Sequence, residues 1–131
     1  MRQEDYILRE IHKIGELLLA IIGKLQKKQD VAQINNELDE LTSLTDLSVD
    51  ELLQLEPGKM VQVLEKLESF NIRNMELFAQ TLFEMHGYFD KNRANMMLER
   101  ALFILEYLEE REKTFSMSRQ DLIAAIKKEY V

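Results

Sequence analysis

The sequence predicts an all-α protein, and three observations lead to that prediction. Apolar residues recur at three- and four-residue steps through most of the 131 residues, which is the period of an amphipathic helix. No stretch alternates apolar and polar residues in the manner of a half-buried strand. Residues suited to helix N-caps stand where the periodic segments begin. We expect about six or seven helices in one domain spanning residues 1–131, arranged as an α-α superhelix behind a long N-terminal helix.

The first two helices are rich in Leu and Ile and make up residues 1–46. The first is expected at about residues 4–28, with its apolar side chains on one face. The second is expected from about Asp30, whose carboxylate is placed to accept the first free amides, to about Leu44. Only Tyr6 of the ten aromatic residues lies before Phe70, so we expect two sub-cores, one packed from Leu, Ile, Val and Met within residues 7–69 and one that contains the aromatic residues.

A helix start is clearest at Ser48. Its hydroxyl is placed to accept the amide of Glu51, whose carboxylate can bond back, while Leu47 and Leu52 form a hydrophobic staple. Pro57 then ends this short helix and suits the first turn of the next. The remaining helices are expected from Pro57 to about Phe70, from a cap at Asn71 or Asn74 to about Phe89, from Arg93 to about Glu112, and from a cap at Ser116 or Ser118 to Tyr130.

The segment from Tyr88 to Ala94, followed by Leu98 and Ala101, resembles the tetratricopeptide repeat. In that family, small residues seven positions apart let the second helix of a hairpin approach the first. The resemblance implies a tetratricopeptide-like hairpin within residues 47–131. Two positions depart from the pattern, because Leu82 and Phe89 stand where the repeat prefers smaller residues. A shift by the 34-residue period pairs Met60, Leu64, Leu67 and Phe70 with Ala94, Leu98, Ala101 and Ile104, and all of these are apolar.

The chain as a whole is similar to a family of small uncharacterised bacterial proteins that occur mostly in Gram-positive species. Their opening helix resembles Asp5-Tyr6-Ile7-Leu8-Arg9-Glu10-Ile11, and a later Leu-Ser element resembles Leu47 to Leu53. The similarity implies an all-helical protein with a tetratricopeptide-like C-terminal half. It implies no activity and transfers no catalytic residue.

The charge of the chain limits its partners. The formal net charge is −7, and Lys24, Lys27 and Lys28 form the one basic cluster, so we expect no nucleic-acid binding. The acidic segment, residues 30–57, holds eight acids and no base. It can either face these lysines within the fold or bind a basic partner. The longest apolar run is too short to span a membrane and no signal-like cleavage site follows it, so we expect no membrane insertion and a cytoplasmic protein.

Few residues in the sequence suit catalysis. There is no cysteine, the four glycines form no phosphate-binding loop, and neither histidine follows a glutamate at the spacing of a di-metal site. We therefore expect no enzyme activity, no catalytic residue, no cofactor and no metal. The rival interpretation is a small-molecule carrier or an enzyme with a pocket between helices near His86, where Glu84 and Tyr88 are the neighbouring polar groups.

The first helix is apolar around most of its circumference, which is more than a peripheral helix should expose. The domain's own core, a symmetry mate or a membrane surface could cover it. We expect a protein-protein interaction module with an unidentified protein partner, self-associating as a homodimer. The apolar stripe expected to serve as the self-association surface consists of Ile14, Leu17, Leu18, Ile21, Ile22 and Leu25.

Overall fold

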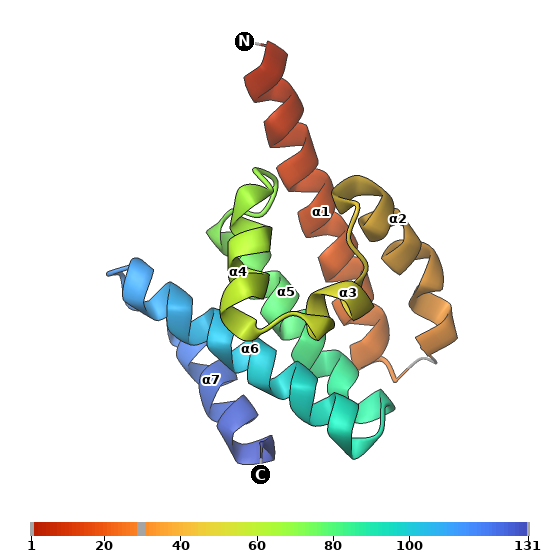
Figure 1. The fold of residues 1–131 in the computed structure, drawn as a ribbon, viewed down its shortest axis with the longest axis vertical. Helices are drawn as coiled ribbons and strands as arrows, with labels where there is room; N and C mark the ends of the chain where they lie inside the picture. The colour runs from red at the N-terminus through yellow and green to blue at the C-terminus, as the bar shows by residue number, and fades with distance from the viewer. Residues whose placement is uncertain (1, 29–30, 131) are drawn as a thin grey trace.

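A computed structural model describes residues 2–28 and 31–130, and in this part of the chain every regular element is a helix (Figure 1). The all-α prediction is therefore confirmed. The elements are α1 (Arg2–Gln26), a 3₁₀ turn (Val31–Ile34), α2 (Asn35–Thr45), α3 (Val49–Gln54), α4 (Pro57–Lys66), α5 (Ile72–Met85), a second 3₁₀ turn (His86–Tyr88), α6 (Lys91–Arg111) and α7 (Met117–Glu129).

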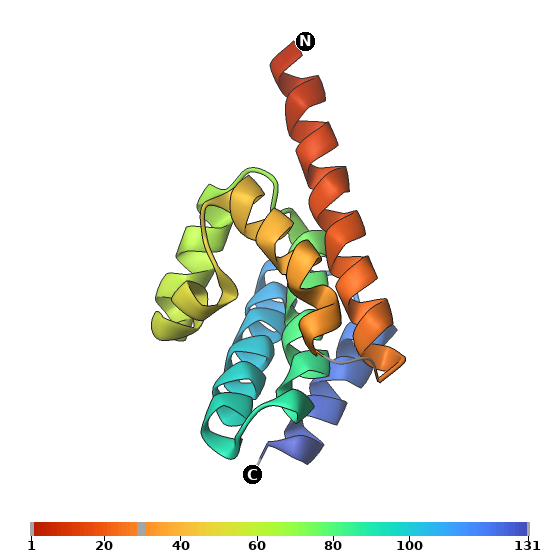
Figure 2. The ribbon, with the colours of Figure 1, turned by 90° about the vertical axis from the view of Figure 1, so that its right-hand side faces the viewer.

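The antiparallel pair α5 and α6 lies at the centre of the molecule. Helix α1 packs along α5, α2 packs on α1, and α7 packs on α6. The short helices α3 and α4 contact each other and α6. Figure 2 shows α1 extending well beyond the rest of the molecule at its N-terminal end.

One hydrophobic core joins the two halves of the chain. A single cluster of buried side chains includes Ile14 and Leu18 from α1 as well as Phe78, Ile104 and Ile126 from the C-terminal helices. The prediction of two sub-cores is therefore wrong. The reason is topological, because α1 packs on α5 and the Leu- and Ile-rich half thus shares its interior with the aromatic half.

Three helix starts follow the caps named from the sequence, and α6 begins at Lys91 rather than at the expected Arg93, because Asp90 caps it. Ser48 and Glu51 form the complete capping box, with both hydrogen bonds at 3.0 Å. Asn71 caps α5 by accepting the amide of Asn74 at 2.9 Å. Asp90 and Ser116 cap α6 and α7 in the same way, accepting the amides three residues later. These side chains satisfy amides that have no partner within the helix.

Several helix ends differ from the prediction. Helix α1 ends at Gln26, and Lys28 adopts a left-handed φ of 59°, which is incompatible with continuing the helix. The expected cap at Asp30 lies outside the described residues, and α2 begins only after the 3₁₀ turn. Helix α4 ends at Lys66 because the chain turns through a hydrogen bond from the amide of Phe70 to the carbonyl of Leu67. This turn leaves Asn71 extended, as an N-cap requires.

Candidate interaction surface

The apolar stripe expected to mediate self-association is part of the domain's own core. Leu17 is half-buried, and the other five residues are at most 5 % exposed within a single chain. The assignment of the stripe to a surface is therefore wrong, because α5 and α2 cover α1 from two sides. Covering by the domain itself was one of the three alternatives that the sequence left open. The five buried residues are Ile14, Leu18, Ile21, Ile22 and Leu25.

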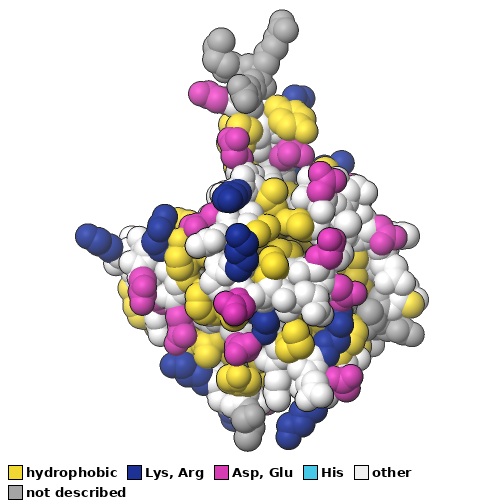
Figure 3. Space-filling view, in the orientation of Figure 1, with side chains coloured by type: hydrophobic (Ala, Val, Ile, Leu, Met, Phe, Trp, Pro, Cys, Tyr) yellow, Lys and Arg dark blue, Asp and Glu magenta, His cyan; other side chains and the backbone are white. Residues whose placement is uncertain are grey.

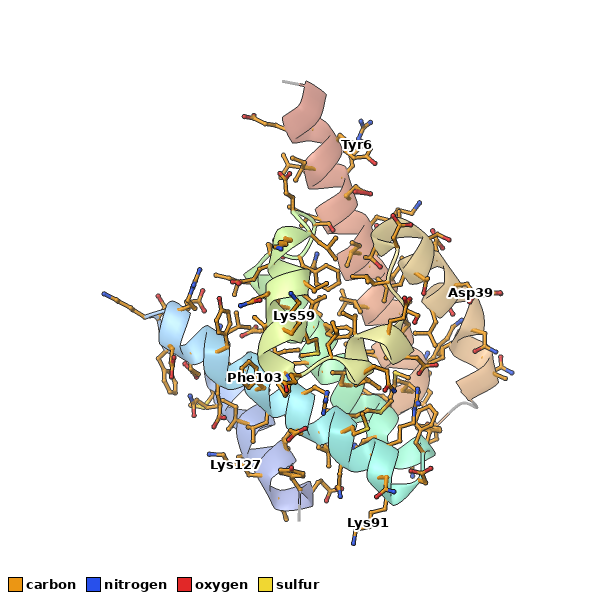
Figure 4. All side chains as sticks on the ribbon, in the orientation of Figure 1. Tyr6, Asp39, Lys59, Lys91, Phe103 and Lys127 are labelled. Atoms are coloured by element: carbon orange, nitrogen blue, oxygen red, sulfur yellow. The ribbon has the colours of Figure 1, made fainter. Side chains whose placement is uncertain are left out.

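The N-terminal end of α1 is a different surface, and we call residues 4–10 the arm. The arm projects from the body (Figures 1 and 2). Tyr6, labelled in Figure 4, is 56 % exposed and Leu8 is 62 % exposed, while Ile7 between them is half-buried. These are high values for large apolar side chains on a helix that elsewhere buries its apolar face.

Acidic side chains flank the apolar face of the arm. Glu4 and Glu10 stand three residues before and after Ile7, so helical geometry places them on the same face as that residue. Arg9 stands two residues after Ile7 and lies on the opposite side. Figure 3 shows hydrophobic, acidic and basic side chains together on this projecting end. The described side chains on this face of the arm therefore combine apolar groups with carboxylates.

A second surface feature is an open hollow of about 680 Å³ between the α4–α5 connection and the C-terminal end of α6. We call it the Arg73 hollow. Its apolar lining comes from both segments, and two arginines, Arg73 and Arg111, stand in its wall. The hollow is lined by Glu65, Phe70, Asn71, Ile72, Arg73, Met75, Tyr107, Leu108 and Arg111.

The two arginines of the hollow differ in their surroundings. Arg111 lies 3.8 Å from a carboxylate oxygen of Glu65 and stacks over the ring of Tyr107. Arg73 is exposed, and the part of the chain that the structure describes offers it no hydrogen bond or ion pair. It also lies in the first turn of α5, where the helix dipole disfavours a cation. The hollow thus presents positive charge beside exposed Ile72.

The phenol of Tyr107 donates a hydrogen bond to the carboxylate of Glu65 at the edge of the Arg73 hollow. This bond needs the protonated phenol, so it raises the pKa of Tyr107 above its ordinary value, and burial acts in the same direction. The carboxylate of Glu65 is therefore occupied from two sides, by Tyr107 and by Arg111.

The polar groups near His86 serve to connect helices. Tyr88 donates a hydrogen bond of 3.0 Å to the carbonyl of Leu25 at the end of α1, and Glu84 accepts one of 3.1 Å from Gln26. The His86 ring contacts the carbonyl of Phe83 and lies 3.4 Å from Glu129 of α7. Glu84 and Tyr88 thus connect the end of α5 and the turn after it to α1. His86 connects that turn to the last turn of α5 and lies near α7.

Some carboxylates of the acidic segment, residues 30–57, form ion pairs with lysines of α1. Lys24 lies 2.8 Å from Glu37, and this hydrogen bond holds the pKa of Glu37 below its ordinary value. Lys13 pairs with Glu40 at 3.3 Å. Lys27 and Lys28, which were expected to join Lys24, are exposed at the end of α1. The internal use of the segment therefore rests mainly on helices α1 and α2.

A buried arginine that the sequence did not single out connects α5, α6 and α7. The side chain of Arg119 is 2 % exposed and contacts the carboxylates of Glu76, Glu109 and Glu112. Burial opposes its charge, but hydrogen bonds to Glu112 and Glu76 outweigh that effect and raise the pKa of Arg119. An arginine three residues after a cap serine is ordinary in sequence, so only its burial reveals its role.

The described residues contain no candidate metal site or membrane-spanning helix, and the chain resembles no protein with which it was compared. No group of three or more His, Asp or Glu residues among them could hold a metal ion. No helix in this part of the chain is long and apolar enough to cross a membrane. Neither a protein-family model, nor a curated protein, nor a solved structure matches the chain.

Proposed function

We propose that this protein is a non-enzymatic helical module that binds other protein chains, a second copy of itself included, through the arm of α1. The observation that carries the proposal is the exposure of Tyr6 and Leu8 on a helix end that projects from the body. Tyr6 and Leu8 flank Ile7 on its two sides around the helix, and a partner can enclose such a helix end in an apolar groove. Exposed apolar side chains gathered on one projecting element favour binding more than the same residues scattered singly would.

The antiparallel helices α5 and α6 supply a rigid support for the arm, and we propose that they form a tetratricopeptide-like hairpin. Ala101 is fully buried on α6, and Ala94, seven residues earlier, is half-buried. Small residues at this spacing allow two helices to approach closely, which supports the proposal. Helix α1 packs along α5, so its projecting end has a fixed direction relative to the hairpin.

Photo-crosslinking at position 6 tests the proposed function. A photoreactive phenylalanine replaces Tyr6 in cells that naturally make the protein, and the same residue replaces Lys91 as a control. Both positions are exposed, and Figure 4 labels them at opposite ends of the molecule. We expect discrete protein adducts from position 6 that position 91 does not give. The same adducts from both positions, or none from position 6, would contradict the proposal.

A further inference from the structure

We propose that the protein forms a two-fold dimer in which the arm of each copy docks into the Arg73 hollow of the other. This inference rests on the proposed function and names its partner as a second copy of the chain. Two surfaces of one molecule carry it, the arm with its apolar face and carboxylates and the hollow with its apolar lining and arginines.

The two surfaces are complementary in chemistry. The arm presents Ile7 with Tyr6 and Leu8 beside it, and the hollow presents Ile72, which is 43 % exposed, and half-buried Tyr107. Burying apolar groups of both surfaces against each other removes them from water. The acids that flank Ile7 meet a hollow whose cations include Arg73, which has no partner among the described residues. Such pairs specify the orientation of docking as well as favouring it.

The fold favours an exchange between copies over contact within one copy. The arm continues α1 as one unbroken helix, Arg2–Gln26, which holds it away from the body (Figure 2). The α4–α5 connection, which lines one side of the hollow, lies toward the same end of the molecule as the arm, and the last turns of α6 lie at the side of the body (Figure 1). A two-fold rotation can therefore place each arm over the hollow of its partner. Such a closed dimer buries both copies of each surface.

Sedimentation velocity with charge-reversed variants tests the exchange. We expect the parent to be a dimer at tens of micromolar. Arg73→Glu should weaken self-association at least tenfold, because the hollow then repels the arm. Glu4→Arg/Glu10→Arg should do the same, because the arm then repels the hollow. Lys91→Glu is the matched control, since it makes the same charge change in the first turn of another helix at the far end of the molecule. This control should leave the dimer intact, and circular dichroism should show parental helicity for all variants.

Mixing the two defective variants gives the sharpest result. An arm carrying arginines fits a hollow carrying glutamate, and the remaining arm and hollow keep their original charges. Equal amounts of Arg73→Glu and Glu4→Arg/Glu10→Arg should therefore form a heterodimer, although each alone stays monomeric. Recovery of the dimer on mixing supports arm exchange, because general loss of structure cannot produce it.

Other outcomes overturn the inference and separate it from the proposed function. A parent that remains monomeric at high micromolar concentration excludes the exchanged dimer. Variants that keep the parental dimer place the interface elsewhere. If position 6 then still crosslinks to proteins of other mass, the arm binds those partners and the proposed function stands. If position 6 gives no adducts beyond those of position 91, both proposals fail.

Discussion

Gly15 of α1 lies directly against the side chain of Asn74 on α5. A Cβ atom at position 15 would stand 3.0 Å from Oδ1 of Asn74, a distance shorter than nine in ten contacts that Cβ atoms make in proteins. The Asn74 side chain cannot easily move away, because its nitrogen Nδ2 donates hydrogen bonds to the carbonyl of Ile11 at 2.9 Å and to that of Ser69 at 2.8 Å. This buried asparagine connects α1 to the start of α5, and the glycine makes room for it.

Two glycines of the same helix should respond oppositely to alanine. Gly15→Ala should lower the free energy of unfolding by about 1 kcal/mol or more, since crowding at Asn74 outweighs the helix preference for alanine. Gly23→Ala has open space around its Cβ and should raise stability by about 0.5–1 kcal/mol. Urea unfolding of both variants measures the two changes. Equal stabilisation by both would show that Asn74 can yield.

Substitution of two neighbouring leucines of α1 should have very different effects, because one is buried in the core and the other is exposed. Leu18 is fully buried and Leu19 is 45 % exposed. Leu18→Glu should unfold the domain, because a carboxylate there would be buried without a partner. Leu19→Glu should change stability by less than about 0.5 kcal/mol. Circular dichroism during thermal melting distinguishes the two. A folded Leu18→Glu variant would show that the apolar stripe lies at the molecular surface and not in the core.

The contribution of the α3 capping box to stability can be measured by comparing Ser48 with a nearby serine that caps no helix. Ser48→Ala removes the acceptor for the amide of Glu51 and should cost about 1 kcal/mol. Ser43→Ala changes an exposed residue inside α2 and should cost much less. Comparable shifts in the urea midpoint for the two variants would contradict the assigned start of α3.

Arg119 should contribute far more to stability than a surface arginine. Arg119→Met leaves three carboxylates without their shared cation and should cost about 2 kcal/mol or more, with water relieving part of the penalty. Arg111→Met is the control, because that side chain is 63 % exposed and lies 3.8 Å from its partner. Its cost should stay below about 1 kcal/mol. Urea unfolding measures both changes in stability. Similar losses of stability for the two variants would contradict a larger contribution from Arg119.

The phenol of Tyr107 should make stability fall in alkaline solution. Its pKa is raised in the folded state, so the folded chain holds this proton over a range in which the unfolded chain has lost it. The stabilisation is complete below the ordinary pKa of 10.0 and is lost as pH rises through the higher folded value. An absorbance titration of the four tyrosines should show one late component that Tyr107→Phe removes. A titration unchanged by that substitution would contradict the hydrogen bond to Glu65.

Local signals in the sequence predicted much of the fold. Ser48, Asn71 and Ser116 cap helices because each bonds an amide only three residues away, an interaction that needs no knowledge of the rest of the chain. Helix ends were harder, since Lys28 and Leu67 leave the helical conformation in response to turns that tertiary packing selects. The expected cap at Asp30 lies outside the described residues.

The candidate site could be predicted only in part. The period of apolar residues placed Leu18 and Ile7 on one face of the first helix, but it could not reveal that α5 covers one and leaves the other at the edge of the body. Arg119 carries no sequence signal, because its burial depends on three helices meeting around it. The Arg73 hollow is formed by segments more than thirty residues apart, so no local pattern could define it.

The packing of α1 on α5 also has a consequence for synthesis on the ribosome. The apolar face of α1 is complete once residue 26 is made, but α5 ends only at residue 85. At about 5–20 residues per second, the nascent helix waits for several seconds with its apolar face in water. During that interval the growing chain is open to aggregation, and chaperones that hold exposed apolar segments would shield it. A chain that terminates before α5 cannot bury that face and should be cleared by proteolysis.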